Sequence, residues 1–520
     1  MAARSAPNNV PLPGTPDLER QPLLASQGNT AINSSTNGNP GARSHLPAAL
    51  GRRPSSLEQQ QRHDAVRKCW RIGIAAIILA LLGFLIFGLM ELLSGHAGGT
   101  PYKHLRGSCD HVEPIGLAEY EQRQANLSRL LYDLKATAYV AEPGTNMKYF
   151  SGIKWTQSER PFLFIVQTKR DKMNQVLTKT TVVAPAFEAS RARQGILPGS
   201  SISIKTWEEG ESAYKAVREV LDTPWTGPDE DDSTDITSGG KKPKDPEQIY
   251  VDPDMRQFVS HGIATALESS NRRVMIANRA IALLRMQKTS HEIEILKCVS
   301  QTTVNVIRAV KQNIKVGSLE SEVQGMITKA YSEAGLDYED GGSLVLFGKD
   351  AALPHGGGND TKLEKGMMVL IDTGARLHGY LSDITRTFWV SRGSSKEMND
   401  ELDKVWDIVK RAQNASLHAI HPGAACSSVD KAARTLIGHE GYGAKFTHRL
   451  GHGLGLDGHE EPYLNIGNTD TELKAGMVFT NEPGIYVEGQ YGIRLEDVVL
   501  VTENGYEILS GSLAASATEP

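Results

Sequence analysis

The longest uninterrupted apolar stretch of the sequence, residues 72–90 (IGIAAIILALLGFLIFGLM), contains no charged side chain. As an α-helix that rises about 1.5 Å per residue it spans about 28 Å, close to the thickness of the hydrocarbon layer of a bilayer. A helix buried in a soluble core normally keeps a polar stripe, and a cleaved signal peptide would lie much nearer the N-terminus. The stretch therefore predicts a transmembrane helix that serves as an uncleaved signal anchor.

The basic residues on either side of this stretch predict the orientation of the anchor. Those before it are Arg52, Arg53, Arg62, Arg67, Lys68 and Arg71, and those after it up to residue 110 are Lys103 and Arg106. Because the more basic flank stays in the cytosol, we expect a single-pass type II membrane protein whose large C-terminal part is lumenal or extracellular. The cytosolic residues 1–68 are poor in large apolar side chains over most of their length, which predicts a disordered tail.

Short motifs bear on localisation. Asn126, Asn359 and Asn414 begin glycosylation sequons in the predicted lumenal part, which would make the protein a glycoprotein, although sequons also arise by chance. In the tail, Leu23 and Leu24 end a segment that resembles an acidic dileucine signal, which sorting adaptors read to route cargo to vacuoles or lysosomes. A chance apolar pair in a disordered tail is the alternative. The motif favours a vacuolar or lysosomal membrane.

Composition excludes several classes of protein. The 61 acidic and 56 basic residues give a net charge of −5, whereas a nucleic-acid-binding protein usually carries a strongly basic domain. Four cysteines without a CxxC pair exclude a disulfide-dense scaffold and disfavour a cysteine zinc site. Cys109, Cys298 and Cys426 fall in the predicted lumenal part. They allow one disulfide and one free thiol, without indicating which pair forms.

Two folded α/β regions are predicted after the anchor at 69–93 and a linker at 94–109. The first covers residues 110–287 and the second covers residues 288–512, which leaves a short tail at 513–520. The first region is expected to hold a helix near 118–134 and three strands near 138–140, 162–166 and 180–183. A turn-rich link is expected near 143–152 and a charged surface loop near 228–248. The second is expected to begin with a helix at Ser290.

Acids and one histidine beside apolar, strand-like runs indicate the chemistry of the second region. These residues are Asp372, Asp383, His452, Glu482 and Glu496. One such acid alone is better explained as a capped turn or a surface ion pair, but burying several is costly unless they are paired or bind metal. Four carboxylates and one imidazole can hold two divalent cations. Two such ions can share a hydroxide and polarise a carbonyl group, which is hydrolase chemistry.

The order of these residues resembles that in the pita-bread metallopeptidases, which include aminopeptidase P, prolidase, methionine aminopeptidase and creatinase. Asp372 and Asp383 stand eleven positions apart, and the other three follow in the family's order. The resemblance implies a mixed α/β fold, with a creatinase-like N-terminal α/β domain and a C-terminal pita-bread catalytic domain. It implies that Asp372 binds one metal ion, that His452 and Glu482 bind the other, and that Asp383 and Glu496 bridge both.

The same resemblance assigns residues around the metal ions. His355, His448 and His459 match histidines that contact the substrate or the tetrahedral intermediate, although each taken singly would more often be an ordinary surface or core histidine. Arg494 matches an arginine that orients the metal-binding carboxylates. Gly458 stands where relatives commonly carry Val or Ile, so the resemblance does not predict the shape of the pocket there.

By this resemblance the chain hydrolyses the peptide bond that precedes proline, as an Xaa-Pro dipeptidase or as an Xaa-Pro aminopeptidase. A hydroxide shared by the two metal ions would be the nucleophile, and Glu482 would carry its proton to the leaving nitrogen. The donor set suits Mn²⁺, with Co²⁺ and Zn²⁺ as alternatives. The extra N-terminal domain argues against methionine aminopeptidase. A homodimer is expected from the resemblance alone.

Two alternative functions fit the residues less well. A membrane-tethered binding protein on an inactive peptidase scaffold would be expected to have lost metal ligands. Creatinase-type C–N hydrolysis would proceed without bound metal. All five metal positions carry the residue types that the metallopeptidases use, which disfavours both alternatives.

Overall fold

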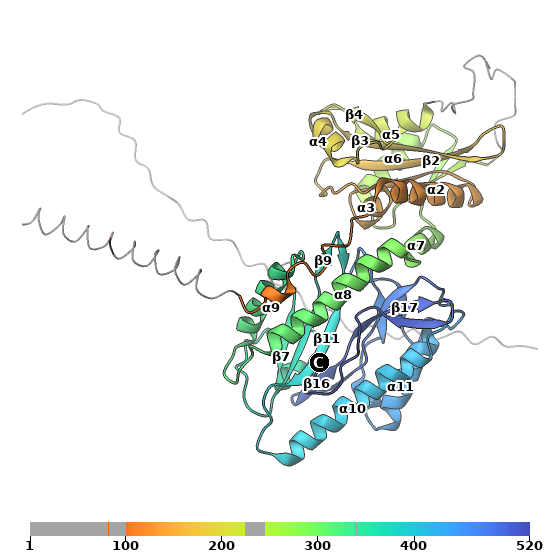
Figure 1. Ribbon diagram of the computed structural model, residues 1–520. Coiled ribbons are helices and arrows are strands. Elements are labelled where there is room, and N and C mark those ends of the chain that lie inside the picture. The colour runs from red at the N-terminus through yellow and green to blue at the C-terminus, as the bar shows by residue number, and fades with distance from the viewer. Residues whose placement is uncertain (1–81, 83–99, 224–244, 339–341) are drawn as a thin grey trace, which may run out of the picture. The chain divides into compact units, whose positions relative to one another are not determined.

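The computed structural model describes residues 82, 100–223, 245–338 and 342–520 (Figure 1). The predicted cytosolic tail and its dileucine motif lie outside these residues, and so does the predicted anchor at 72–90 apart from Leu82. No helix in the described ranges combines the length and the apolar character needed to cross a bilayer. The described residues from Thr100 onward belong to one compact unit.

A six-stranded mixed sheet with helices on both faces forms the first folded region. Its strand order is β4-β3-β2-β1-β5-β6. The elements are α2 (Leu117–Asp133), β1 (Ala136–Ala141), α3 (Thr145–Ser151), β2 (Leu163–Arg170), β3 (Val176–Pro185), α4 (Ala189–Gly195), β4 (Ser203–Trp207), α5 (Ala213–Asp222), β5 (Glu247–Val251), α6 (Gln257–Leu267), β6 (Arg272–Ile276) and α7 (Arg279–Met286). Side chains of β1 alternate between faces: Val140 packs in the core beneath α5 and α6, and Tyr139 packs in the core that contains α2.

Two predicted features of this region differ in the structure. The predicted turn-rich link at 143–152 contains the helix α3, which ends where Gly152 adopts a positive φ of 73°. The Gly and Asn residues that suggested turns lie at the ends of this short helix, whose Met147 and Phe150 are buried in the core, so packing outweighs local propensity. The predicted loop at 228–248 is described only from residue 245, and Glu247 and Gln248 begin β5.

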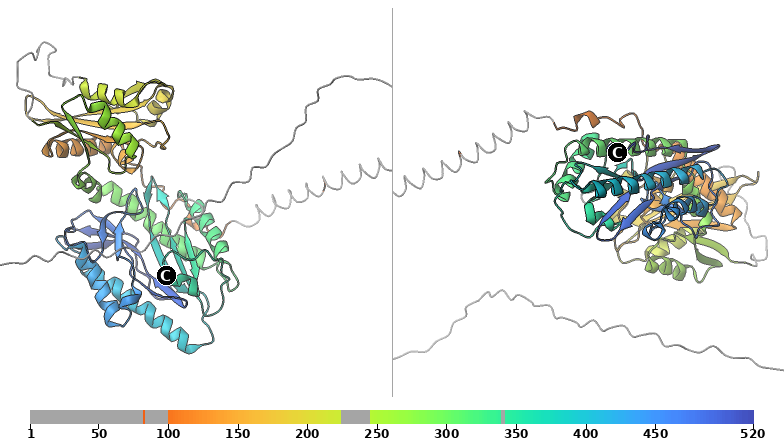
Figure 2. Two further views of the ribbon diagram at one scale, coloured as in Figure 1. Left: turned by 180° about the vertical axis from the view of Figure 1, so that it is seen from behind. Right: turned by 90° about the horizontal axis from the view of Figure 1, so that it is seen from below.

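The second region repeats one arrangement, a helix pair followed by antiparallel strands. The elements are α8 (Ser290–Lys311), α9 (Glu320–Ala334), β7 (Leu344–Phe347), β8 (Met368–Thr373), β9 (Arg376–Leu377), β10 (Tyr380–Leu381), β11 (Ile384–Trp389), α10 (Lys396–His418), α11 (Cys426–His439), β12 (Gly451–Gly453), β13 (Glu460–Leu464), β14 (Val478–Asn481), β15 (Gly484–Val487), β16 (Tyr491–Arg494), β17 (Asp497–Thr502) and β18 (Gly505–Ile508). The larger sheets have the orders β11-β8-β7 and β13-β12-β14-β17-β18. The strands lie between α8 on one side and α10 with α11 on the other (Figures 1 and 2).

The helix α8 begins at Ser290, as predicted from the sequence. Its N-cap is Thr289: the Thr289 hydroxyl accepts the N–H of Glu292 at 3.2 Å, and the Glu292 carboxylate accepts the N–H of Thr289 at 2.9 Å. This reciprocal capping box satisfies two N–H groups that the first turn of a helix leaves open.

Residues 100–115, which we call the N-terminal strap, pack onto the second region, although their first part was predicted to be a linker. Tyr102 and Leu105 are buried, and Arg106 forms an ion pair of 2.5 Å with Glu333 of α9. The final segment, predicted to be a tail, is also packed: the N–H of Trp389 donates to the carbonyl of Ala517 at 2.7 Å. Sequence patterns could not indicate either contact, because both join segments distant in the chain.

A disulfide ties the strap to α8. It joins Cys109 to Cys298, and Cys426 is a buried free thiol. The structure thus resolves the pairing that the sequence left open. Because the bond links positions 189 residues apart, a chain-entropy account gives it about 5 kcal/mol of stabilisation of the folded state.

Candidate metal centre

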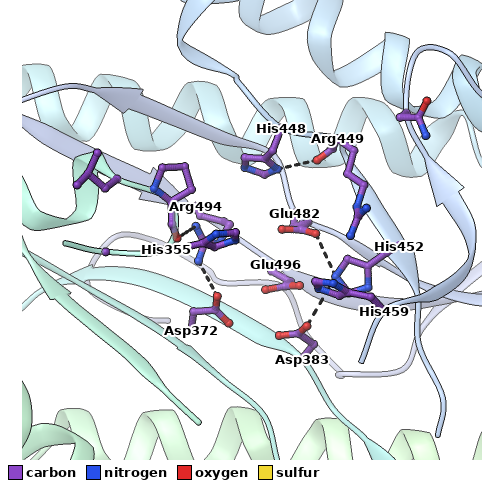
Figure 3. A pocket seen from close by; sticks show the side chains of 14 residues that line it. His355, Asp372, Asp383, His448, Arg449, His452, His459, Glu482, Arg494 and Glu496 are labelled. Carbon is purple, nitrogen blue, oxygen red and sulfur yellow. Dashed lines mark hydrogen bonds and ion pairs between the residues drawn. The ribbon is translucent and has the colours of Figure 1, made fainter. Parts of the chain in front are cut away.

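The five predicted metal ligands are gathered at neighbouring strand ends of the second region (Figure 3). Asp372 lies in β8 and Asp383 directly precedes β11, the antiparallel partner of β8. His452 lies in β12, Glu482 directly follows β14, and Glu496 lies between β16 and β17. Residues separated by up to 124 positions thereby reach one site (496 − 372 = 124).

Their donor atoms form two overlapping groups. Oxygens of Asp372, Asp383 and Glu496 lie within 4.8 Å of one another, and so do donor atoms of His452, Glu482 and Glu496. His452 Nε2 lies 3.3 Å from Glu482 Oε1 and 3.7 Å from Asp383 Oδ2. Glu496 therefore belongs to both groups, an arrangement that can serve two adjacent cations.

The electrostatics of this cluster fit bound divalent cations. Burial, together with the charges of neighbouring carboxylates, raises the pKa values of Asp383 and Glu496 well above the usual range. Ionised carboxylates so close together in a buried site repel one another and lose hydration. Divalent cations relieve both costs, and oxygen donors with one imidazole are a suitable ligand set for them.

Arg494 links the carboxylate cluster to two supporting side chains, Thr385 and Tyr486. Its Nη2 donates to Asp372 Oδ2 at 2.6 Å, its Nε to Thr385 Oγ1 at 3.0 Å, and its Nη1 to the Tyr486 hydroxyl at 2.8 Å. The Thr385 hydroxyl in turn donates to Glu496 Oε2 at 2.6 Å. These contacts fix the orientation of Asp372 and Glu496, two of the five predicted metal ligands.

Thr385 and Tyr486 were not among the residues predicted from the sequence. Thr385 stands two residues after Asp383 and pairs with Asp372 across β8 and β11, so strand alternation could have indicated it. Tyr486 carried no comparable signal, because Pro483 separates its strand from β14. Burial raises the pKa of Tyr486 to about 12, which keeps its hydroxyl protonated.

The three additional histidines line the same cavity in different ways (Figure 3). His448 Nε2 lies 2.9 Å from the Tyr486 hydroxyl, and burial lowers the pKa of its imidazole. The ring of His459 lies 4.0 Å from that of His452, centroid to centroid, and burial and the neighbouring His452 lower its pKa. His355 lies on the exposed loop before β8.

The cavity itself has a volume of about 920 Å³. Its lining includes all five predicted metal ligands, the three histidines and Arg494, together with Arg449 and Asn465, which the sequence analysis did not single out. A concave site with a few converging polar groups is the usual form of an active site.

Comparison with known proteins identifies the family. Residues 294–503 match metallopeptidase family M24. An uncharacterized peptidase of Schizosaccharomyces pombe is 34% identical over 469 residues, which cover 87% of this chain and 96% of that protein. The chain belongs to metallopeptidase family M24. The predicted pita-bread fold and the predicted metallopeptidase activity are thereby confirmed.

Solved structures of similar proteins cover most of this M24 metallopeptidase. Prolidase from Pyrococcus furiosus is 28% identical with a TM-score of 0.58, and the match covers 74% of this chain and 99% of that chain. An X-Pro aminopeptidase from Thermotoga maritima is 25% identical with a TM-score of 0.59, covering 75% and 98% respectively. Because both matches exceed the M24 region in length, they include the preceding six-stranded sheet region in part.

Proposed function

We propose that this M24 metallopeptidase hydrolyses the peptide bond that precedes proline, and that dipeptides are its preferred substrates. The cavity with its five converging metal-binding side chains carries the hydrolase assignment. The similarity to a prolidase and to an X-Pro aminopeptidase supports the preference for proline. A non-catalytic binding protein would have no need for this complete set of donors.

Two divalent ions, with Mn²⁺ as the best match to the donors, would be held by the five side chains. Asp372 would bind one ion, His452 and Glu482 the other, and Asp383 and Glu496 both. When bound, such ions polarise the substrate carbonyl and lower the pKa of water.

The side chains of the protein supply the remaining chemistry. Glu482 accepts a proton from the attacking water and returns it to the proline nitrogen as the peptide bond breaks. His355 and His459 face the cavity where they can donate hydrogen bonds to the developing oxyanion. Arg494 holds Asp372 in place through its hydrogen bond of 2.6 Å.

Arg449 favours dipeptides over longer substrates. Its side chain extends into the cavity (Figure 3). Its guanidinium carbon lies 4.7 Å from the centroid of the Tyr463 ring. Among the described residues no carboxylate pairs with this guanidinium. A guanidinium binds a carboxylate through two parallel hydrogen bonds. In an Xaa-Pro dipeptide the terminal carboxylate belongs to the proline itself, whereas in a longer peptide that position is a neutral amide.

Arg449→Gln should therefore raise KM for Xaa-Pro dipeptides by about 10–100-fold, the loss expected for a hydrogen bond to a charged group. KM for Xaa-Pro-Tyr tripeptides should change by less than about threefold, because they place no charge at this position. Steady-state kinetics on both substrate series measures the difference. Equal losses on dipeptides and tripeptides would show that Arg449 does not bind the terminal carboxylate.

The proposed function is tested with the full chain, purified in detergent and loaded with Mn²⁺, Co²⁺ or Zn²⁺. The substrates are Xaa-Pro dipeptides, Xaa-Pro-Yaa tripeptides and matched peptides with alanine in place of proline. Cleavage of the dipeptides alone supports the proposal. Efficient cleavage of the tripeptides makes the protein an Xaa-Pro aminopeptidase instead. Absence of proline-dependent cleavage with every metal overturns the proposal.

We also propose that the folded part lies in an oxidising lumen, behind a type II anchor at residues 72–90. The Cys109–Cys298 disulfide supports this, since reducing systems keep most cytosolic thiols free. Of the three sequon asparagines, Asn359 lies in an exposed loop, while Asn126 and Asn414 lie within α2 and α10. Vacuolar sorting through Leu23 and Leu24, glycosylation and dimer formation stay predictions.

The oxidation state of the cysteines tests the proposed compartment. In protein isolated from its native membranes, with thiols alkylated before lysis, we expect the peptides of Cys109 and Cys298 to be joined. Cys426 should be alkylated only after denaturation, because it is fully buried. Mass spectrometry without reductant measures both. Alkylated Cys109 in most of the protein would contradict an oxidising location.

A further inference from the structure

The loop that carries His459 into the cavity, residues 455–461, has contacts from both inside and outside the M24 region; we call it the His459 loop. From inside, Arg376 Nη1 donates to the carbonyl of Leu456 at 3.0 Å and the N–H of Leu381 to the carbonyl of Gly455 at 2.8 Å. No hydrogen bond of the His459 ring is found within the described ranges, so its position depends on the loop backbone. A Cβ atom at the preceding Gly458 would meet no atom closer than 4.0 Å, so packing there restrains the loop little. Other contacts must fix the ring.

Arg285 of α7 supplies the most direct of these contacts. Its Nη2 donates to Asp457 Oδ2 at 2.8 Å and to Glu460 Oε2 at 2.5 Å, two acids that flank His459. Its Nη1 donates to Asn146 Oδ1 of α3 at 2.8 Å. Only 11% of the Arg285 side chain is exposed, and the two acids outweigh burial and raise the pKa of its guanidinium.

Two further residues that precede α8 add to the attachment. Lys288 Nζ, whose side chain is 1% exposed, donates to Glu460 Oε1 at 2.6 Å. The hydroxyl of Thr145, the first residue of α3, donates to Asp457 Oδ1 at 2.5 Å. Both acids beside His459 are thus bound by side chains that precede α8. The contacts of Glu460 have little exposure to water, so solvent screens them weakly, whereas the side chain of Asp457 is 39% exposed.

We propose that Arg285, assisted by Lys288, is a positioning residue that fixes the His459 loop against the six-stranded sheet region. The sheet region thereby sets the geometry of a histidine at the substrate cavity. This inference rests on the proposed function only for the role of His459 as a group that contacts the substrate. It gives the first region a part in catalysis without placing any of its side chains on the substrate.

Arg285→Gln removes the charge and should lower kcat/KM for Xaa-Pro dipeptides by about 10–100-fold, since small displacements of a catalytic group cost this much. Arg285→Lys keeps one charge and should recover part of the loss. Arg272→Gln is the matched control: Arg272 is 13% exposed, binds Asp222 and Glu247, and lies in β6. We expect its kcat/KM to stay within about threefold of the wild type.

A double-mutant cycle separates positioning from a general loss of stability. In a His459→Ala background, Arg285→Gln should reduce kcat/KM by no more than about twofold, because the group it positions is already absent. The same full loss in both backgrounds would show that Arg285 acts through the fold as a whole, and would overturn the inference.

Hydrogen exchange tests the attachment without reference to activity. Arg285→Gln should accelerate amide exchange in peptides that cover residues 454–462, whereas Arg272→Gln should leave these peptides unchanged. Unchanged protection in Arg285→Gln would overturn the inference even in an active enzyme. A wild-type protein that cleaves no Xaa-Pro peptide but shows the accelerated exchange would overturn the proposed function and retain the attachment.

Discussion

Glu482→Gln should lower kcat for Xaa-Pro hydrolysis by about 10²–10⁴-fold, the range that a positioned proton carrier contributes. The substitution keeps the shape of the side chain but removes its capacity to take a proton. Burial opposes ionisation of Glu482, but its hydrogen bond to His452 and the nearby positive charges outweigh burial and lower its pKa. In the metal-free site these contacts favour the ionised carboxylate, which is the form that accepts a proton.

Steady-state kinetics at saturating Mn²⁺ measures this effect, and circular dichroism checks that the fold is retained. Glu488→Gln is a suitable control, since Glu488 is an exposed acid in the turn between β15 and β16. It should keep wild-type kcat. A Glu482→Gln protein that retains more than about a tenth of wild-type kcat would exclude Glu482 as the proton carrier.

Asp383→Asn should have opposite effects on stability with and without metal. In the metal-free protein it removes one of several mutually repelling buried carboxylates, so the variant should melt at a higher temperature than the metal-free wild type. Adding Mn²⁺ at 100 times its Kd should stabilise the wild type by about 2.7 kcal/mol. The variant should lose most of that gain, because Asp383 belongs to the donor cluster.

Thermal denaturation with EDTA and with Mn²⁺ gives both comparisons. Asp407→Asn, an exposed acid of α10, is the control and should follow the wild type in each condition. A wild-type melting temperature that does not respond to Mn²⁺, Co²⁺ or Zn²⁺ would show that the cluster does not hold divalent ions.

The side chains of the candidate metal centre could be predicted from the sequence, because they lie at strand ends and follow the family's order along the chain. Asp372 and Glu496 each adjoin an apolar run, and the family order of the five residues relates them. The neighbouring contacts are marked more weakly: strand alternation places Thr385 on the same face as Asp383, but it does not indicate the contact of Thr385 with Arg494. Thr385 is one threonine among many in strands, and the helix α3 is shorter than the length at which periodicity identifies a helix.

Contacts between distant segments were beyond any local pattern. The sequence predicted one disulfide among three cysteines, but the pairing of Cys109 with Cys298 depends on how the strap packs against α8. Arg285 and Asp457 are 172 residues apart, and no sequence motif indicates that they are in contact. Such pairs are set by tertiary packing, which a single sequence does not display.

The position of the disulfide has a mechanical consequence. The bond gives the chain a covalent path from residue 109 to residue 298 that bypasses the main chain between them. A force applied at residue 100 would pass through this bond into α8, and the six-stranded sheet would carry almost none of it. The sheet region therefore lies outside the path of the force while the disulfide is intact. If the disulfide is reduced, the force passes through the main chain of the sheet region instead.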